Sequence, residues 1–339
     1  MGKPDIVLNA YMKDSNRVRS VLEYYLGEKL PEDWEWAEMR GLYPARDSKG
    51  KQTFRQRDIM GKACAWGTHF FLGLENQDKV NLIFPWRLME MDCLAYGEEI
   101  DEIRTKNRCT RRNYGKEDDF LYCYGREDRM EPVLNLILYW GKEQWDWPFS
   151  LRDMMEGMSA LPPKMKRLVG NYEVQVIHMR SIPEKALEKM DSDLKYVLGM
   201  LRRAGCRKEY WSYIQENREF FCRIPKSALN VIDAYINIGE MHKYMEFEMN
   251  METGEEEADM CKALQDLQKE AMKKGVKQGL KEGISQGITQ GITQGITQGI
   301  QLVQCLLADG RQEDVARAAD DELYRKKLLA EYGMKELYK

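Results

Sequence analysis

The sequence predicts an α/β fold with a mixed central sheet flanked by helices, followed by a helical C-terminal region. Three observations lead to this prediction. Residues 54–65 and 68–77 read as two strands that meet at Trp66-Gly67, which is the expected turn of a hairpin. Residues 83–107 follow with the pattern of a long helix, with Pro85 in its first turn. A near-continuous apolar run at 132–141 is typical of a central strand buried on both faces.

The other elements of this region follow from the same periodicities. Apolar residues at helical spacing predict a helix over 16–26 that ends at Gly27. The next segment, with Trp34 and Trp36, is expected to be less regular, and 44–50 is expected to be a loop. Residues 172–179 alternate as a further strand, and the pattern from 184 to 249 is helical.

Glycine recurs at every fourth position from 275 to 299, mostly within Gln-Gly-Ile-Thr units. Seven helical glycines cost about 7 kcal/mol relative to alanine, so an isolated helix is expected to be weak here. A period of four also overshoots 3.6, so the Gly/Ile stripe rotates around the helix. Two interpretations stay open: a tolerated linker, or a stripe for close, right-handed helix contacts. A final helix is expected over 301–328.

Composition excludes several classes of protein. No apolar run approaches the roughly 20 residues that cross a bilayer, and the N-terminus lacks a secretory signal pattern. Eight cysteines without a CxxC pair, together with three histidines, argue against a zinc finger or ribbon. Scattered thiols suggest a reducing compartment, so a cytoplasmic protein without a membrane partner is expected.

The net charge of −4 hides two local groups of basic residues. Each group either neutralises the phosphates of a nucleic acid or is solvated surface. The groups are Arg104, Lys106, Arg108, Arg111 and Arg112, and Arg202, Arg203, Arg207 and Lys208.

Register within the predicted hairpin brings a carboxylate pair together. A two-residue turn at 66–67 pairs residues whose numbers sum to 133, so Asp58 faces Glu75. Gln77 shares that face, whereas Phe70, Leu72 and Leu74 form the opposite, core face. Carboxylates on neighbouring strands can bind Mg²⁺ or another divalent cation, and the ion can activate a water and polarise a phosphoryl oxygen. Gln77 can orient that water but supplies no positive charge.

The flanks of these residues resemble a known family. The runs Arg57-Asp58-Ile59, Leu72-Gly73-Leu74-Glu75-Asn76-Gln77 and Phe84-Pro85-Trp86-Arg87 resemble the core of the Rpn family of recombination-promoting nucleases and putative transposases. So do 132–141 and 145–151, and the resemblance extends from near the N-terminus to about residue 245.

The resemblance implies a PD-(D/E)XK restriction-endonuclease-like core and a metal-dependent DNA endonuclease linked to recombination or transposition. By position, Asp58 and Glu75 match the metal carboxylates and Gln77 matches the residue that replaces the superfamily lysine. The lysine often found three residues after the Asp is Gly61 here, with Lys62 next. The expected organisation is a nuclease-like core over 1–182, a helical extension over 183–250, a linker and glycine repeat over 251–300, and a helical tail over 301–339.

Other candidates have more ordinary explanations. Glu23 can add an acidic ligand, but a helix-surface position is favoured. His69 shares the face of Glu75, but a structural histidine is favoured. Trp140, Trp145 and Trp147 can stack on bases, but core packing is favoured. The sequence has no P-loop and no GxSxG motif, so nucleotide-driven and serine-hydrolase chemistry have no support.

Two functions from different classes follow. The favoured one is a Mg²⁺-dependent endonuclease in which Lys62, Arg57 and the basic groups hold the DNA backbone. The alternative is a catalytically weak or inactive DNA-binding protein of the same fold that forms homo-oligomers through its C-terminal tail.

Overall fold

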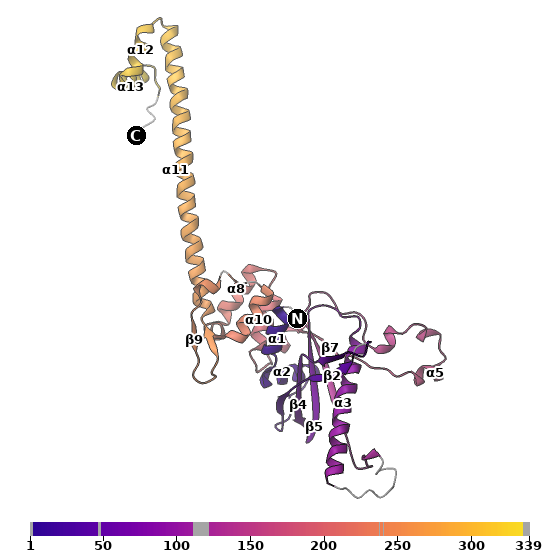
Figure 1. Cartoon of the computed structure of the whole chain (residues 1–339). Helices are drawn as coiled ribbons and strands as arrows, with labels where there is room; N and C mark the ends of the chain where they lie inside the picture. Colours follow the sequence, from indigo (N-terminus) through magenta and orange to yellow (C-terminus); the bar gives the residue numbers. More distant parts are fainter. Residues whose placement is uncertain (1–2, 47–48, 111–121, 237, 240, 335–339) are drawn as a thin grey trace. The chain divides into compact units, whose positions relative to one another are not determined.

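A computed structural model describes residues 3–46, 49–110, 122–236, 238–239 and 241–334 (Figure 1). The chain divides into two compact units, Met1–Ala263 and Leu264–Lys339, and each is described by itself. The first unit is mixed α/β and the second is helical. No helix among the described residues has the length and apolar character of a membrane span.

A five-stranded mixed sheet forms the centre of the first unit, in the order β1-β4-β5-β6-β7. Neighbouring strands are antiparallel from β1 to β5 and parallel from β5 to β7. The strands are β1 (Glu35–Met39), β4 (Ile59–Ala65), β5 (Thr68–Gln77), β6 (Val133–Tyr139) and β7 (Val176–His178). The predicted mixed sheet is therefore confirmed, although β7 is shorter than the 172–179 strand expected.

The β4–β5 hairpin has the predicted register, because Ile59 pairs with Leu74 and Ala65 pairs with Thr68. Its turn residues have φ values of 54° at Trp66 and 68° at Gly67, as a tight two-residue hairpin turn requires. The ladder ends at Ile59 and Leu74, and Asp58 and Glu75 are the next residues on the two strands, which the predicted register places opposite each other.

The segment before β4 differs from the expectation. The predicted strand over 54–65 breaks at Arg57 and Asp58, where the Arg57 N–H donates instead to the Gly41 carbonyl at 2.8 Å. Its first part is β3 (Gln52–Gln56), which pairs with β2 (Leu42–Arg46) in a separate two-stranded sheet. The expectations of an irregular segment around Trp36 and of a loop starting at 44 were therefore wrong, because both places contribute strands.

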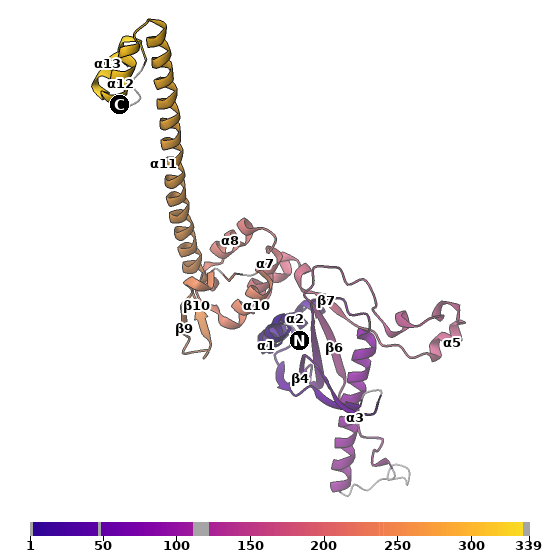
Figure 2. The same ribbon diagram turned by 45° about the horizontal axis from the view of Figure 1, so that its top comes forward.

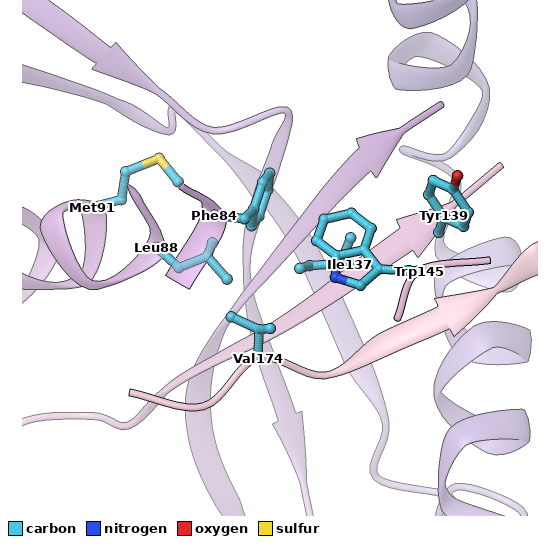
Figure 3. Close-up of a cluster of buried hydrophobic side chains, with 7 residues drawn as sticks. All are labelled: Phe84, Leu88, Met91, Ile137, Tyr139, Trp145 and Val174. Carbon is cyan, nitrogen blue, oxygen red and sulfur yellow. The ribbon is translucent and has the colours of Figure 1, made fainter. Parts of the chain in front are cut away.

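One face of the central sheet packs against α3 (Phe84–Cys109). Figure 3 shows apolar side chains of α3, β6 and the later loops in one cluster. Its buried members are Phe84, Leu88, Met91, Ile137, Tyr139, Trp145 and Val174. Because Glu75 pairs with Ile137 in the β5–β6 ladder, Glu75 faces the same side as this cluster.

The opposite face of the sheet packs against α1 (Lys3–Tyr11), which also contacts α10 (Lys226–Ile236). The predicted helix at 16–26 is α2 (Ser15–Leu26). Asp14 caps its N-terminus, and Gly27 ends it with a φ of 77°, a conformation that glycine adopts at low cost. The expected helical pattern after residue 184 is confirmed for most of its length.

The remaining elements of the first unit are short. Two of the later strands join β10 in a three-stranded sheet, in the order β8-β10-β9. These elements are η1 (Leu151–Met154), η2 (Met158–Ala160), α5 (Pro163–Leu168), η3 (Met179–Ser181), α6 (Glu184–Leu187), α7 (Leu194–Arg202), α8 (Arg207–Glu216), α9 (Arg218–Phe221), β8 (Ile224–Pro225), η4 (Met241–Tyr244), β9 (Phe247–Met249) and β10 (Glu256–Ala258).

The C-terminal region contains one long helix, α11 (Met260–Ala308), which runs through all of the glycine repeat. The final helix expected over 301–328 is instead the end of α11, then α12 (Gln312–Asp320) and α13 (Glu322–Glu331). Figure 2 shows α12 and α13 folded back beside the end of α11. A small core of Leu302, Leu306, Ala318 and Leu328 holds these three segments together.

Candidate metal centre

The β4–β5 hairpin places the carboxylate pair at one end of the central sheet. Asp58 is the residue before β4 and is half-buried, whereas Glu75 lies within β5 and is fully buried. Alternation of side chains along the strand suggested an open polar face for Glu75, but Glu75 does not lie on one. Helices cover β5 on both faces, with α1 on one face and α3 on the face of Glu75.

The carboxyl group of Glu75 is buried with few groups around it that would stabilise its ionised form. Neither of its oxygens makes a hydrogen bond of normal geometry with any residue that the structure describes. Within the described part of the chain, its one ion pair is with Arg87 of α3, whose Nη2 lies 3.6 Å from Glu75 Oε2. Burial raises the pKa of Glu75 to about 8, and the negative charge of Asp58 adds to the rise while Arg87 and Arg57 oppose it.

Asp58 is better solvated and better bonded. Its Oδ1 accepts a hydrogen bond from Asn9 Nδ2 at 3.2 Å, and its Oδ2 accepts one from the Asn76 N–H at 3.0 Å. Burial raises the pKa of Asp58, while the hydrogen bond from Asn9 and the charge of Arg87 lower it. Asp5 of α1 lies near enough for its charge to raise that pKa further.

Asn76, between Glu75 and Gln77, anchors this end of the sheet from its other face. Its side chain donates to Asn9 Oδ1 at 2.8 Å and accepts from Trp140 Nε1 at 2.9 Å. Helix α1, β5 and the end of β6 are therefore tied together at Asp58. The sequence interpretation assigned no role to Asn9, Asn76 or Arg87, although Asn76 and Arg87 stand in the motifs that it quoted.

Gln77 lies two residues beyond Glu75 and is half-buried at the end of β5. Its Nε2 donates to the Asn76 carbonyl at 2.8 Å, which fixes the amide at the strand end. Strand alternation puts it on the face of Glu75, as predicted.

Asp58 and Glu75 both offer the oxygen ligands that a divalent cation prefers, and they lie near enough for the charge of Asp58 to raise the pKa of Glu75. Mg²⁺ takes oxygen ligands and is commonly bound by one or two carboxylates. Two unsatisfied, buried carboxylate oxygens at Glu75 are what a cation would stabilise. Among the described residues, three or more potential ligands converge only at Cys222, Asp259 and Cys261, which lie elsewhere in the first unit.

A cavity of about 460 Å³ opens beside Asp58. Lys13 and Arg40 line it together with Asp58, and both are exposed. Lys13 pairs with Glu38 at 2.6 Å, whereas no described residue forms an ion pair with Arg40. These two cations, rather than those expected from the sequence, lie next to the candidate site. No short motif marks them, because they come from the start of the chain and from the β1–β2 connection.

Arg57 does not have the predicted role of holding DNA. Its side chain is buried and its guanidinium hydrogen-bonds Asp92 and Asn135. Asn135 Nδ2 in turn donates to Asp92 Oδ2 at 2.8 Å, and the Tyr172 hydroxyl also bonds Asp92. This network fixes the backbone at the break between β3 and β4, directly before Asp58.

Lys62 forms an ion pair with Glu131 at 2.6 Å and is only partly exposed. Its ammonium group is therefore already neutralised within the protein, which does not favour its predicted contact with DNA. Gly61 has a packing explanation. A Cβ atom there would approach the ring of Trp36 to 2.3 Å, so a lysine at this position would displace the indole.

The two basic groups are partly engaged within the protein. Arg104 pairs with Asp101 at 3.5 Å, and Arg203 pairs with Glu184 at 3.2 Å. The Arg207 guanidinium lies 4.5 Å from the Trp211 ring centroid. Arg111 and Arg112 lie outside the described residues.

The remaining candidates lie away from the pair. Glu23 is buried, not on the helix surface, and its carboxylate binds Arg19 and Lys29 at 2.9 Å each. His69 is exposed next to the hairpin turn, six residues and about 20 Å along β5 from Glu75. Trp140 and Trp145 are core residues as expected, but Trp147 is 45% exposed, so core packing was the wrong expectation for it.

Comparisons with protein families, curated proteins and solved structures find no match to this chain. The chemistry of the site is therefore inferred from its residues and geometry.

Proposed function

We propose that this protein is a metal-dependent DNA endonuclease of the PD-(D/E)XK fold, acting in DNA recombination or transposition. The observation that carries the proposal is the fully buried Glu75 carboxylate beside Asp58, which makes no hydrogen bond of normal geometry with the described residues and only a 3.6 Å ion pair with Arg87. A buried polar group with so little hydrogen bonding is rare in folded proteins and is explained when an ion belongs there.

The topology around the pair supports this assignment. Asp58 and Glu75 come from adjacent antiparallel strands, and β5 then pairs with the parallel strand β6. A mixed sheet with helices on both faces is what the resemblance to the Rpn family implies. Helix α1 adds Asn9 and Asp5 to the side of Asp58, so acidic and amide groups from a helix complete the pair.

The residues have distinct roles in this proposal. Asp58 and Glu75 would hold Mg²⁺, which when bound would polarise the phosphoryl oxygen and activate a water. Gln77 would orient that water through its side-chain amide. Lys13 and Arg40, in the cavity wall next to Asp58, would hold phosphates of the DNA backbone.

Plasmid cleavage by the full chain tests this proposal. We expect nicking or linearisation of supercoiled plasmid with Mg²⁺ and none with a chelator. Asp58→Asn and Glu75→Gln should each lower the rate by about 100-fold or more, because a bound ion contributes several kcal/mol to such reactions. Asp101→Asn, on the exposed surface of α3, is the matched control and should cleave normally. Equal background nicking by the wild type and Asp58→Asn would refute the catalytic assignment.

A second candidate function has its own support. Arg87 already places a cation near Glu75, which favours a nuclease-fold protein that binds DNA without cutting it. Helix α11 also carries a stripe of exposed apolar residues, which favours homo-oligomers through the tail. The stripe comprises Val276, Leu280, Ile284, Ile288, Ile292, Ile296 and Ile300.

This candidate makes different predictions. DNA binding should weaken with salt and should not change in Glu75→Gln. The double variant Ile288→Glu/Ile292→Glu should lower the mass of the full chain in light scattering, whereas Gln290→Glu should not. An unchanged mass in the double variant would remove the proposed role of the stripe.

A further inference from the structure

Three potential metal ligands converge in the first unit, away from the Asp58–Glu75 pair. The Sγ atoms of Cys222 and Cys261 and a carboxylate oxygen of Asp259 all lie within 4.8 Å of one another. We propose that these three side chains bind a thiolate-preferring divalent ion, Zn²⁺, as a site separate from the nuclease centre.

The backbone brings the three ligands together. Cys222 follows α9 and comes just before β8, and β8 pairs with β10 so that Ile224 lies opposite Ala258. Cys222 lies in the turn that ends α9, two residues before β8, and Asp259 and Cys261 lie just after β10, where α11 begins. The pairing of β8 with β10 therefore brings the two segments that carry the ligands side by side.

The distances among the three ligand atoms fit tetrahedral coordination of an ion after a small movement of the side chains. Zn–S bonds of about 2.3 Å put ligand atoms about 3.8 Å apart, so the atoms here need to close by about 1 Å at most. Asp259 also caps α11, because its Oδ1 accepts from the Lys262 N–H at 2.7 Å. A carboxylate has a second oxygen, so it can cap the helix and ligate an ion together.

One side of the group is closed and the other is open. Cys261 is 1% exposed, whereas Cys222 and Asp259 also line a cavity of about 480 Å³. Three protein ligands and one open position describe a zinc site whose fourth ligand is a water. The water would stand in that cavity, which Glu246 and Glu257 also line.

Local charges are consistent with a bound cation. Two thiolates and one carboxylate would leave Zn²⁺ with one net negative charge, and the Arg218 guanidinium lies beside the Cys222 sulfur to offset it. Soft sulfur ligands favour Zn²⁺ over Mg²⁺, so the two sites would select different ions.

Metal content of the full chain tests the proposal. The protein is purified with a reductant, loaded with Zn²⁺, desalted and analysed for bound zinc. We expect one zinc ion per chain in the wild type and loss of that ion in Cys222→Ser, Cys261→Ser and Asp259→Asn. The asparagine variant is chosen because Asn retains the capping oxygen of α11 while losing the charge. Cys206→Ser, at an exposed cysteine outside the group, is the matched control and should retain the ion.

Cobalt provides a readout that needs no variant. Co²⁺ added to the wild-type chain should give the intense near-ultraviolet absorption of thiolate-to-cobalt charge transfer, and added Zn²⁺ should remove it. Absence of bound zinc together with absence of this band in folded wild-type protein would overturn the proposal. Retention of zinc by all three ligand variants would overturn it as well, because the ion would then lie elsewhere.

Discussion

Arg87 Nη2 lies 3.6 Å from Glu75 Oε2 and is the only described cation that forms an ion pair with this buried carboxylate. The separation exceeds a hydrogen bond, so Arg87 offsets the charge without satisfying either oxygen. The same guanidinium also lowers the pKa of Asp58, after burial has raised it. The Arg87 side chain is 33% exposed, so this cation reaches the buried carboxylate from the protein surface.

Replacing Arg87 by Gln should raise the pKa of Glu75 above its value of about 8. Loss of a nearby positive charge disfavours the ionised carboxylate. The measurement uses two pairs of proteins that differ only at Glu75. The free energy of unfolding of Arg87→Gln is compared with that of Arg87→Gln/Glu75→Gln across pH, and the wild type is compared with Glu75→Gln in the same way. The pH midpoint of the difference should be higher in the first pair. An unchanged midpoint would mean that Arg87 does not act on Glu75 in solution.

Glu75→Gln should remove a loss of folding stability that the wild type shows as pH rises. The folded pKa of about 8 lies above the ordinary value of 4.5, so the unfolded state ionises first as pH rises. Stability of the wild type relative to the variant should therefore fall between about pH 4.5 and pH 8 and then level off. Because Glu75 is fully buried, the total change should be on the order of a few kcal/mol.

Thermal or urea unfolding across this pH range measures the effect. Gln has no titrating group, so any cost of burying its amide is the same at each pH. Parallel curves for the two proteins would contradict the elevated pKa.

Magnesium should stabilise the wild type more as pH rises through 8. The ion and the proton compete for the same buried carboxylate, and an ion that binds only the folded state shifts unfolding by mass action. Melting temperatures with Mg²⁺ and with a chelator give the measurement. Glu75→Gln should lose the stabilisation, and Asp101→Asn should keep it. A shift of equal size in Glu75→Gln would place the ion elsewhere.

The sequence predicts the strand contacts at this site but not its surroundings, for a physical reason. Turn chemistry at Trp66-Gly67 fixes the register locally, so the alignment of Asp58 with Glu75 follows from counting residues. The covering of Glu75 by α3 and the burial of Arg57 depend on contacts between residues far apart in the chain. Arg57 reads as a surface cation until Asp92, 35 residues later, is known to lie beside it.

In the glycine repeat, by contrast, local propensity alone did not indicate the secondary structure. Its intrinsic helix propensity is low, yet α11 is continuous through it. Each Thr of the repeat at 289, 293 and 297 donates its hydroxyl to the carbonyl four residues earlier at 2.9 Å, a side-chain bond compatible with a helix. The segment is therefore helical, and its low propensity bears on the stability of α11 rather than on its secondary structure.

Breaking the buried Arg57–Asp92 pair should destabilise the first unit. Arg57→Met leaves Asp92 buried without its cation, which costs about 3–5 kcal/mol in comparable pairs. The double variant Arg57→Met/Asp92→Leu removes both charges and should recover a large part of that loss. Urea unfolding followed by tryptophan fluorescence reports this unit, because all eight tryptophans lie in it. A double variant no more stable than Arg57→Met would show that the charge pair is not the source of the loss.

Two glycine-to-alanine substitutions should change stability in opposite directions. A Cβ atom at Gly73 would lie 2.6 Å from both Arg57 Nη1 and Asn135 Oδ1, whereas one at Gly287 meets nothing within 4 Å. Gly73→Ala should therefore push the Arg57 network apart and cost about 1–3 kcal/mol in the first unit. Gly287→Ala should instead favour α11 by about 1 kcal/mol, because alanine is the better helix former.

Tryptophan fluorescence for the first unit and far-ultraviolet circular dichroism for α11 separate the two effects. Gly287→Ala should raise the helical signal at high temperature without moving the fluorescence transition. If Gly73→Ala is neutral, the buried network has room to rearrange and does not fix the position of Asp58. If it is destabilising and also lowers Mg²⁺ binding, the network beneath β5 positions the carboxylate pair.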